Sequence, residues 1–288
     1  MDIFITGILL GGAYALMAMG LQLQYGVARI MNLANGEILV AGAFGAFWFY
    51  TGFSVSPIIS LTLVVPMAFA LNWLIFRYLL LPLVKRAKDQ GRLEIDSILA
   101  TFGLSFVFVG LMITFFGGEF FSYSYLERAF TILEEPYGLN RVAAFAASVF
   151  FAAILYLWLN KTRAGLALRA VSVNPVSAGL VGINVAKFSA LAFAIGGGVT
   201  AAGGGLLSMF LLFDATIGVI FTMKALIIVI LGGVREIRGT IVAAFLLGIA
   251  ETTVARLVDP GLTLAAAYLL FLLILLFRPQ GLFGRNTQ

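Results

Sequence analysis

Cysteine and histidine are both absent from the 288 residues of this chain. Their absence excludes disulfides, thiolate nucleophiles and imidazole groups that bind metals or transfer protons. Charged residues are scarce as well, at 11% of the sequence, whereas an ordinary soluble domain has about a quarter. The few acidic residues are scattered, which leaves little from which to build a catalytic set. We therefore predict no enzyme activity, no metal site and no cofactor for this chain.

Apolar residues, in contrast, make up 62% of the sequence. A soluble fold would have to expose large apolar patches to accommodate that share, so the composition indicates an integral membrane protein. Strands that close into a barrel would show an alternating pattern that is missing here, which leaves helices. Charge-free runs near the length that crosses a bilayer, about 20 residues, are the expected spans: Ile3–Leu23, Ile38–Phe53, Pro57–Phe76, Ser97–Gly118, Val142–Leu159, Phe188–Phe213 and Gly261–Phe277.

Two further runs contain charged residues. Lys224 interrupts Ala215–Val234, and Glu251 with Arg256 interrupts Thr240–Val258. Lys224 is also compatible with a short or broken helix, because few apolar residues follow it in its run. Together the runs predict an all-α bundle of about eight to ten spans, folded as a single transmembrane domain over residues 1–288.

Arginine and lysine in the connecting segments predict the orientation, because short basic loops stay in the cytoplasm. The segment 119–141 has four glutamates against two arginines, and it alternates along the chain with basic segments. We therefore expect the N-terminus outside and the C-terminus in the cytoplasm. The basic residues on the cytoplasmic side are Arg29, Arg77, Lys85, Arg86, Lys88, Arg92, Lys161, Arg163, Arg169, Lys187, Arg235, Arg238, Arg278 and Arg285. This distribution indicates membrane topology rather than nucleic-acid binding.

The predicted cytoplasmic loop, about residues 160–187, contains the sequence RAVSVNPVSAGLVGIN at 169–184. Asn174 is a good helix N-cap, and Pro175 suits the first helical position. The pattern predicts a short helix from Pro175 to about Val181, ended by Gly182 in the left-handed conformation. Its apolar residues fall on one face, so the helix either rests on the bilayer surface or docks in a groove of a partner protein.

The stretch RAVSVNPVSAGLVGINVAKF resembles the cytoplasmic loop of bacterial ABC-transporter permeases of the branched-chain amino acid family. Four further segments are similar to the family, and all five occur in the family's order. The chain departs from the family at Asn35, where histidine is usual, and after the paired glycines, where a Gly-Ser-type turn and a proline are common. The four segments are YGVARIMNLANGE (Tyr25–Glu37), MKALIIVILGGV (Met223–Val234), GIAE (Gly248–Glu251) and RPQGLFG (Arg278–Gly284).

The resemblance implies a fold of the ABC importer permease type in a bacterial plasma membrane. In the family, this loop contains a coupling helix that sits in a groove of the ATPase subunit. The implied partners are a second permease subunit, homologous or identical, cytoplasmic ATPase subunits and an extracytoplasmic substrate-binding protein. By this resemblance, the coupling residues are Arg169, Asn174, Pro175, Val176, Ala178, Leu180, Gly182 and Ile183.

The chain has no GxxxxGK[ST] phosphate-binding loop, so the ATPase that the resemblance implies must be a separate chain. Its glycine clusters, 196–198 and 203–205, lie inside a long apolar run without a basic residue. A nucleotide loop is excluded there, and we expect these glycines to let helices pack closely.

Several polar residues fall within or beside the predicted spans. An ionisable side chain near the bilayer centre costs roughly 2.5–3.5 kcal/mol on insertion scales, so it should have a partner or face a water-filled path. Structural ion pairs and a hydrogen-bonded seam between helices are one interpretation, and a lining for the translocation pathway is the other. The candidate pathway residues are Gln22, Asn32, Asn35, Glu37, Lys224 and Glu251.

The predicted function is that of the membrane-spanning permease subunit of a bacterial ABC importer for branched-chain or other hydrophobic amino acids. Relatives on the same scaffold carry urea, short amides or other small solutes, which is the first alternative. A stand-alone secondary transporter is a remoter alternative, and an inverted internal repeat would be its mark. No clear repeat is visible in the sequence.

Overall fold

The computed structural model describes residues 2–87, 89–126, 128–132, 135–234, 236–278 and 280–283. Of the residues used to predict the orientation, Lys88, Glu127, Glu134, Arg235 and Arg285 lie outside these ranges. The helices are α1 (Asp2–Ala28), α2 (Asn35–Phe53), α3 (Pro57–Ile75), the π-helix η1 (Phe76–Leu80), α4 (Leu81–Arg86), α5 (Gln90–Phe116), α6 (Leu139–Lys161), α7 (Arg163–Val173), α8 (Pro175–Leu180), α9 (Val185–Leu207), α10 (Gly218–Gly232), α11 (Ile237–Leu257), the 3-10 helix η2 (Pro260–Leu262) and α12 (Thr263–Phe277).

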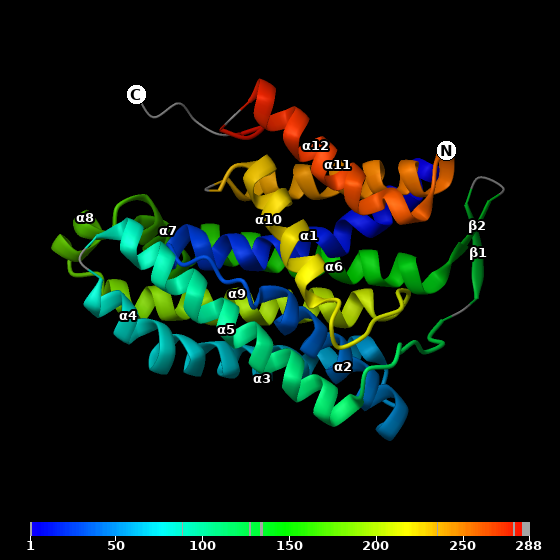
Figure 1. The fold of residues 1–288 in the computed structure, drawn as a ribbon, viewed down its shortest axis with the longest axis horizontal. Helices are drawn as coiled ribbons and strands as arrows, with labels where there is room; N and C mark the ends of the chain where they lie inside the picture. Colours follow the sequence, from blue (N-terminus) through cyan, green and yellow to red (C-terminus); the bar gives the residue numbers. More distant parts are fainter. Residues whose placement is uncertain are drawn as a thin grey trace.

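Each predicted run lies on one helix of the bundle (Figure 1). Seven helices of the described chain are long and apolar enough to cross a membrane, and α3, η1 and α4 join into one of them, Pro57–Arg86. The prediction of a short helix at Lys224 is confirmed, because α10 has only 15 residues. The predicted end of the run Phe188–Phe213 was wrong, because α9 ends at Leu207. Phe213 instead pairs with Phe121 through two backbone hydrogen bonds of 2.8 and 3.1 Å.

Helices α2 and α10 both begin inside the bundle rather than at its surface (Figure 1). Their N-termini meet: the backbone N–H of Gly36 donates to Thr222 Oγ1 at 2.8 Å, and a Cβ on Gly36 would overlap the carbonyl oxygen of Gly218. Each follows a non-helical segment, residues 29–34 before α2 and 208–217 before α10. Irregular backbone at this depth is tolerated because protein surrounds it.

Helix α9 lies at the centre, against α1, α2 and α3, and it is the most enclosed of the seven spans. The predicted role of its glycines is confirmed. A Cβ on Gly196 would lie 2.5 Å from the carbonyl oxygen of Gly20, and one on Gly204 would overlap the carbonyl oxygen of Leu39. The backbones of α1, α2 and α9 therefore approach more closely than any side chain would allow.

The two ends of the bundle differ in composition. At one end lie α4, α7 and α8, with the basic segments that connect them (Figure 1). At the other end lie the start of α1 and a two-stranded antiparallel hairpin, β1 (Ala129–Ile132) and β2 (Glu135–Gly138), which the sequence analysis did not predict. The basic and acidic connecting segments are thus separated along the long axis of the molecule.

The glycine contacts predict a matched pair of stability effects. Gly204→Ala places a methyl group against the backbone of α2, which cannot move like a flexible side chain, so we expect a loss of about 1–3 kcal/mol or more. Gly52→Ala is the control, because no atom lies within 4 Å of a Cβ there and alanine favours a helix. Thermal unfolding of the purified protein in detergent should show a lower Tm for Gly204→Ala alone. Equal Tm values would mean that α9 does not pack in this way.

Candidate coupling and translocation site

Helices α7 and α8 form a capped double turn at one end of the bundle. The Thr162 side chain accepts from the backbone N–H of Gly165 at 3.0 Å, which starts α7. Asn174 starts α8 by accepting from the N–H of Ser177 at 3.0 Å, and Pro175 is the first helical residue. Gly182 has a φ of +83° just beyond α8. The predicted start and end of the short helix are therefore confirmed.

The apolar residues of α8 and its C-terminal turn face outward. Val176 is 74% exposed, Leu180 84% and Val181 75%. Ala178, in contrast, is buried among residues of α6, α7 and α9, and Ile183 packs partly against the same cluster. We call residues 174–183 the knob: Ala178 and Ile183 attach it to the bundle, while Val176, Leu180 and Val181 form an unpartnered apolar surface.

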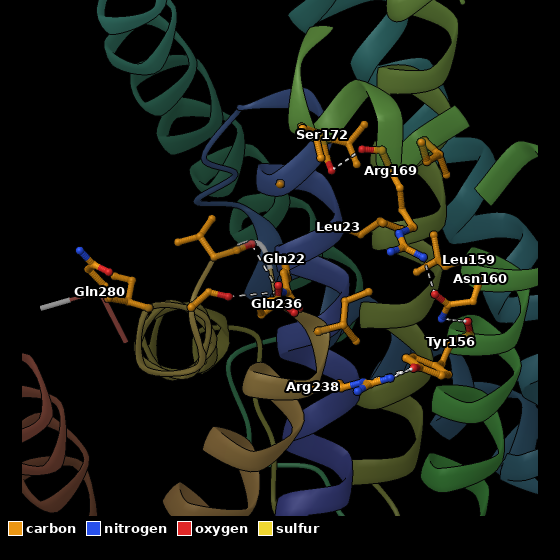
Figure 2. A pocket seen from close by; sticks show the side chains of 18 residues that line it. Gln22, Leu23, Tyr156, Leu159, Asn160, Arg169, Ser172, Glu236, Arg238 and Gln280 are labelled. Carbon is orange, nitrogen blue, oxygen red and sulfur yellow. Dashed lines mark hydrogen bonds between the residues drawn. The ribbon is translucent and has the colours of Figure 1, made fainter. Parts of the chain in front are cut away.

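A cavity of about 760 Å³ lies beside α7, between α1, α6 and the turn that joins α10 to α11. It brings together Gln22, a predicted pathway residue, and Arg169, a predicted coupling residue (Figure 2). Arg169 Nη1 donates to Asn160 Oδ1 at 2.6 Å. Gln22 Nε2 donates to the carbonyl oxygens of Gly233 and Val234 at 3.4 and 3.3 Å. The cavity therefore connects the predicted coupling segment with the membrane helices.

The predicted pathway residues Asn32 and Asn35 lie in a buried hydrogen-bonded seam. Asn32 Nδ2 donates to Gln24 Oε1 at 2.9 Å, and Gln24 Nε2 donates to the carbonyl oxygen of Phe193 at 3.2 Å. Thr200 of α9 donates to Asn35 Oδ1 at 3.0 Å. The seam fixes the non-helical segment between α1 and α2 to α9.

Glu37 is fully buried in the first turn of α2, beside the start of α10. An added Cβ on Gly218, the first residue of α10, would lie 2.7 Å from Glu37 Oε2. Among the described residues, neither carboxylate oxygen has a hydrogen-bond partner apart from the residue's own backbone N–H. The N-termini of two helices therefore lie beside this buried carboxyl group.

The remaining two pathway candidates form a buried ion pair. Lys224 Nζ donates to Glu251 Oε2 at 2.8 Å and to the hydroxyl oxygen of Tyr14 at 2.9 Å. Tyr14 in turn donates to Glu251 Oε2 at 2.8 Å. The triad links α1, α10 and α11. Lone charges in hydrocarbon need partners, but sequence alone gave no signal that Tyr14 would be the third member.

The six pathway candidates thus occupy three places within the chain: the cavity (Gln22), the seam and α2–α10 junction (Asn32, Asn35 and Glu37), and the triad (Lys224 and Glu251). Sequence reasoning missed Thr200 and Thr222, since threonine is common in apolar helices. It also missed Arg238, which belongs to the cavity. In the described part of the chain, no three acidic residues come close enough to hold a metal ion.

These features define the class: a polytopic helical membrane protein with two helices that begin inside the bundle and an apolar knob at one end. A family model described as the branched-chain amino acid transport system, permease component, matches residues 3–278. The chain therefore belongs to that family of permease components.

The individual relatives are similar over almost their whole length. The chain is 28% identical over 298 residues to the high-affinity branched-chain amino acid transport system permease protein BraD of Pseudomonas aeruginosa, covering 98% of this chain and 94% of the relative. It is 28% identical over 300 residues to LivH, a permease protein of the same transport system in Escherichia coli K12, covering 97% and 94%. Among solved structures, PsaBC from Streptococcus pneumoniae in complex with Fab matches with a TM-score of 0.49 at 12% identity, covering 98% and 94%.

The triad predicts strong coupling between its charged members. Lys224→Met leaves Glu251 buried without its cation, and Glu251→Gln leaves Lys224 without its anion, so each change should cost about 3–5 kcal/mol. The double variant removes both charges, and most of that loss should be recovered. Unfolding free energies in detergent would give the coupling energy as a double-mutant cycle. Additive losses would indicate that the two charges act independently.

Proposed function

We propose that this chain is the membrane-spanning subunit of a bacterial importer for branched-chain or other hydrophobic amino acids, driven by separate ATPase subunits that dock on the knob. The exposed apolar surface of the knob is the observation that carries the proposal. Burying a leucine-sized side chain against a partner contributes about 1.5–3 kcal/mol. Three such residues on one small projection therefore favour a protein partner.

The position of the knob separates docking from the alternative of a helix lying on the bilayer. Helix α8 lies with α7 at one end of the molecule's long axis (Figure 1). Its apolar residues are exposed at that end, whereas an interfacial helix would have its apolar face buried toward the acyl chains. The six-residue length of α8 also offers little apolar area for anchoring.

The separation of charge along the bundle supports a cytoplasmic knob. Segments 77–92 and 160–187 are basic and lie at the knob end, and the acidic segment 119–141 lies at the opposite end. By the positive-inside rule the knob end faces the cytoplasm. The opposite end would then face the substrate-binding protein, and a second permease subunit would complete the pathway.

Packing supplies a route from the knob to the membrane interior. Ala178 and Ile183 hold the knob on the cluster formed with α6, α7 and α9. Helix α9 in turn contacts α2 through Gly204, and α2 meets α10 at Gly36. Motion of the docked ATPases would therefore displace α9 and, with it, the junction of α2 and α10. That displacement would switch the pathway between outward and inward openings.

Leu180→Glu tests docking. A carboxylate on the knob would have to be desolvated in the partner's groove, so co-purification of the ATPase and ATP-dependent leucine uptake in proteoliposomes should both fall by about tenfold or more. Leu257→Glu is the matched control, because Leu257 is 70% exposed and is the last residue of α11, at the end of the bundle away from the knob. Retained ATPase binding by Leu180→Glu would remove the knob from the mechanism.

Single cysteines test the orientation, since the chain has none of its own. Ser177→Cys lies on the exposed side of the knob, and Ser122→Cys is exposed near the hairpin end. In intact cells a membrane-impermeant thiol reagent should label Ser122→Cys at once, and Ser177→Cys only after permeabilisation. Ala178→Cys, which is buried, controls for access. The reverse labelling pattern would invert the topology.

A further inference from the structure

Two guanidinium groups enter the cavity beside α7 from opposite sides (Figure 2). Arg169 is held by Asn160, and Arg238 is held by Tyr156, whose hydroxyl oxygen accepts from Nη2 at 2.8 Å and from Nε at 3.2 Å. Tyr156 and Asn160 are one helical turn apart on α6, so both anchors come from the same face of that helix. Within the described ranges, neither arginine forms a salt bridge. The pair therefore offers charged donors to an anionic group.

The cavity also presents acceptors. Gln22 is 3% exposed, and its Oε1 has no hydrogen-bond partner in the part of the chain that the structure describes. Because Nε2 of the same amide is engaged by two backbone carbonyls, the orientation of the amide is fixed by its hydrogen bonds. The carboxylate of Glu236 lines the same cavity. A buried acceptor without a donor is costly, and an ammonium group would satisfy it.

The rest of the lining is largely aliphatic. Leu23 and Val27 of α1 and Ile230 of α10 line the cavity, among other apolar residues. Its volume, about 760 Å³, lies in the range of small-molecule sites, roughly 300–1,000 Å³. The lining thus combines anion-binding donors, cation-binding acceptors and apolar surface.

We propose that this cavity binds a zwitterionic α-amino acid with an aliphatic side chain, with its carboxylate between Arg169 and Arg238 and its ammonium group on Gln22 Oε1 and Glu236. The inference rests on the proposed function, which makes such an amino acid the cargo and the knob end cytoplasmic. The cavity would therefore hold the amino acid at the cytoplasmic end of its path. Because α7 carries Arg169 and continues into α8, the bound amino acid bridges the coupling segment to α11.

The same pair of charged groups occurs on an aminophospholipid, so the experiment separates the two sources. The permease–ATPase complex, without binding protein, is placed in nanodiscs of phosphatidylcholine, whose headgroup has no N–H donor. Equilibrium binding of radiolabelled leucine is then measured. We expect saturable binding in these nanodiscs, and competition by phosphatidylethanolamine would identify the lipid as an alternative occupant. Leucine binding that is absent in phosphatidylcholine would overturn the proposal.

Two leucine analogues test the charged groups separately in the unmodified protein. Isopentylamine lacks the carboxylate and 4-methylpentanoate lacks the ammonium group, so each should bind at least about tenfold more weakly than leucine, the effect of one charge-assisted hydrogen bond. Equal binding of 4-methylpentanoate would reduce the cavity to an anion site and contradict the proposal.

Two variants place the binding in this cavity. Arg238→Gln should raise the leucine Kd about tenfold or more, and Tyr156→Phe, which keeps the ring but releases Arg238, should raise it by a smaller factor. Arg256→Gln is the control, since this exposed arginine pairs with Asp2 at the opposite end of the bundle. An unchanged Kd in both cavity variants would refute the assignment. If the complex imports leucine but does not bind it here, only this inference fails; if it does not import leucine, the proposed function fails.

Discussion

The rest of this structure depends on how closely α9 approaches α1 and α2, which glycine permits at each contact. Gly20 faces Gly196, and Gly204 faces the backbone of Leu39. In lipid there is no hydrophobic force between helices, so association relies on close van der Waals packing and hydrogen bonds. That packing encloses the seam, holds α2 in place and brings its start against α10. Without it, α2 and α10, which both begin inside the bundle, would expose unpaired backbone inside the membrane.

The polar residues of the membrane region follow from the same constraint. Two of them have partners on other helices: Asn35 accepts from Thr200, and Lys224 donates to Glu251 and Tyr14. Glu37 differs, since its carboxyl group faces two helix N-termini instead of a side chain. For Lys224 and Glu251, hydrogen bonds offset the cost of burying charge. These contacts join helices that are distant in sequence, so they also transmit displacements between them.

The knob and the cavity connect this interior to the surface. Ala178 anchors the knob, and the apolar residues of the knob face outward. Arg169, which precedes the knob, lines the cavity together with Gln22 of α1. A ligand in the cavity and a protein on the knob would therefore act on one short segment, residues 163–183, from opposite sides.

The sequence by itself determined the class, the helical spans and the knob. Apolar run length, charge placement and the Asn174–Pro175 cap are local properties, and the bilayer and the backbone act on them locally. It also offered a short or broken helix around Lys224 as an alternative, and α10 is the short one. Only the tertiary structure decided that α2 and α10 meet end to end, that Tyr14 completes the triad and that Arg238 faces Arg169 across a cavity. These pairings join residues up to 237 positions apart, and three-dimensional packing selects such partners while local pattern does not.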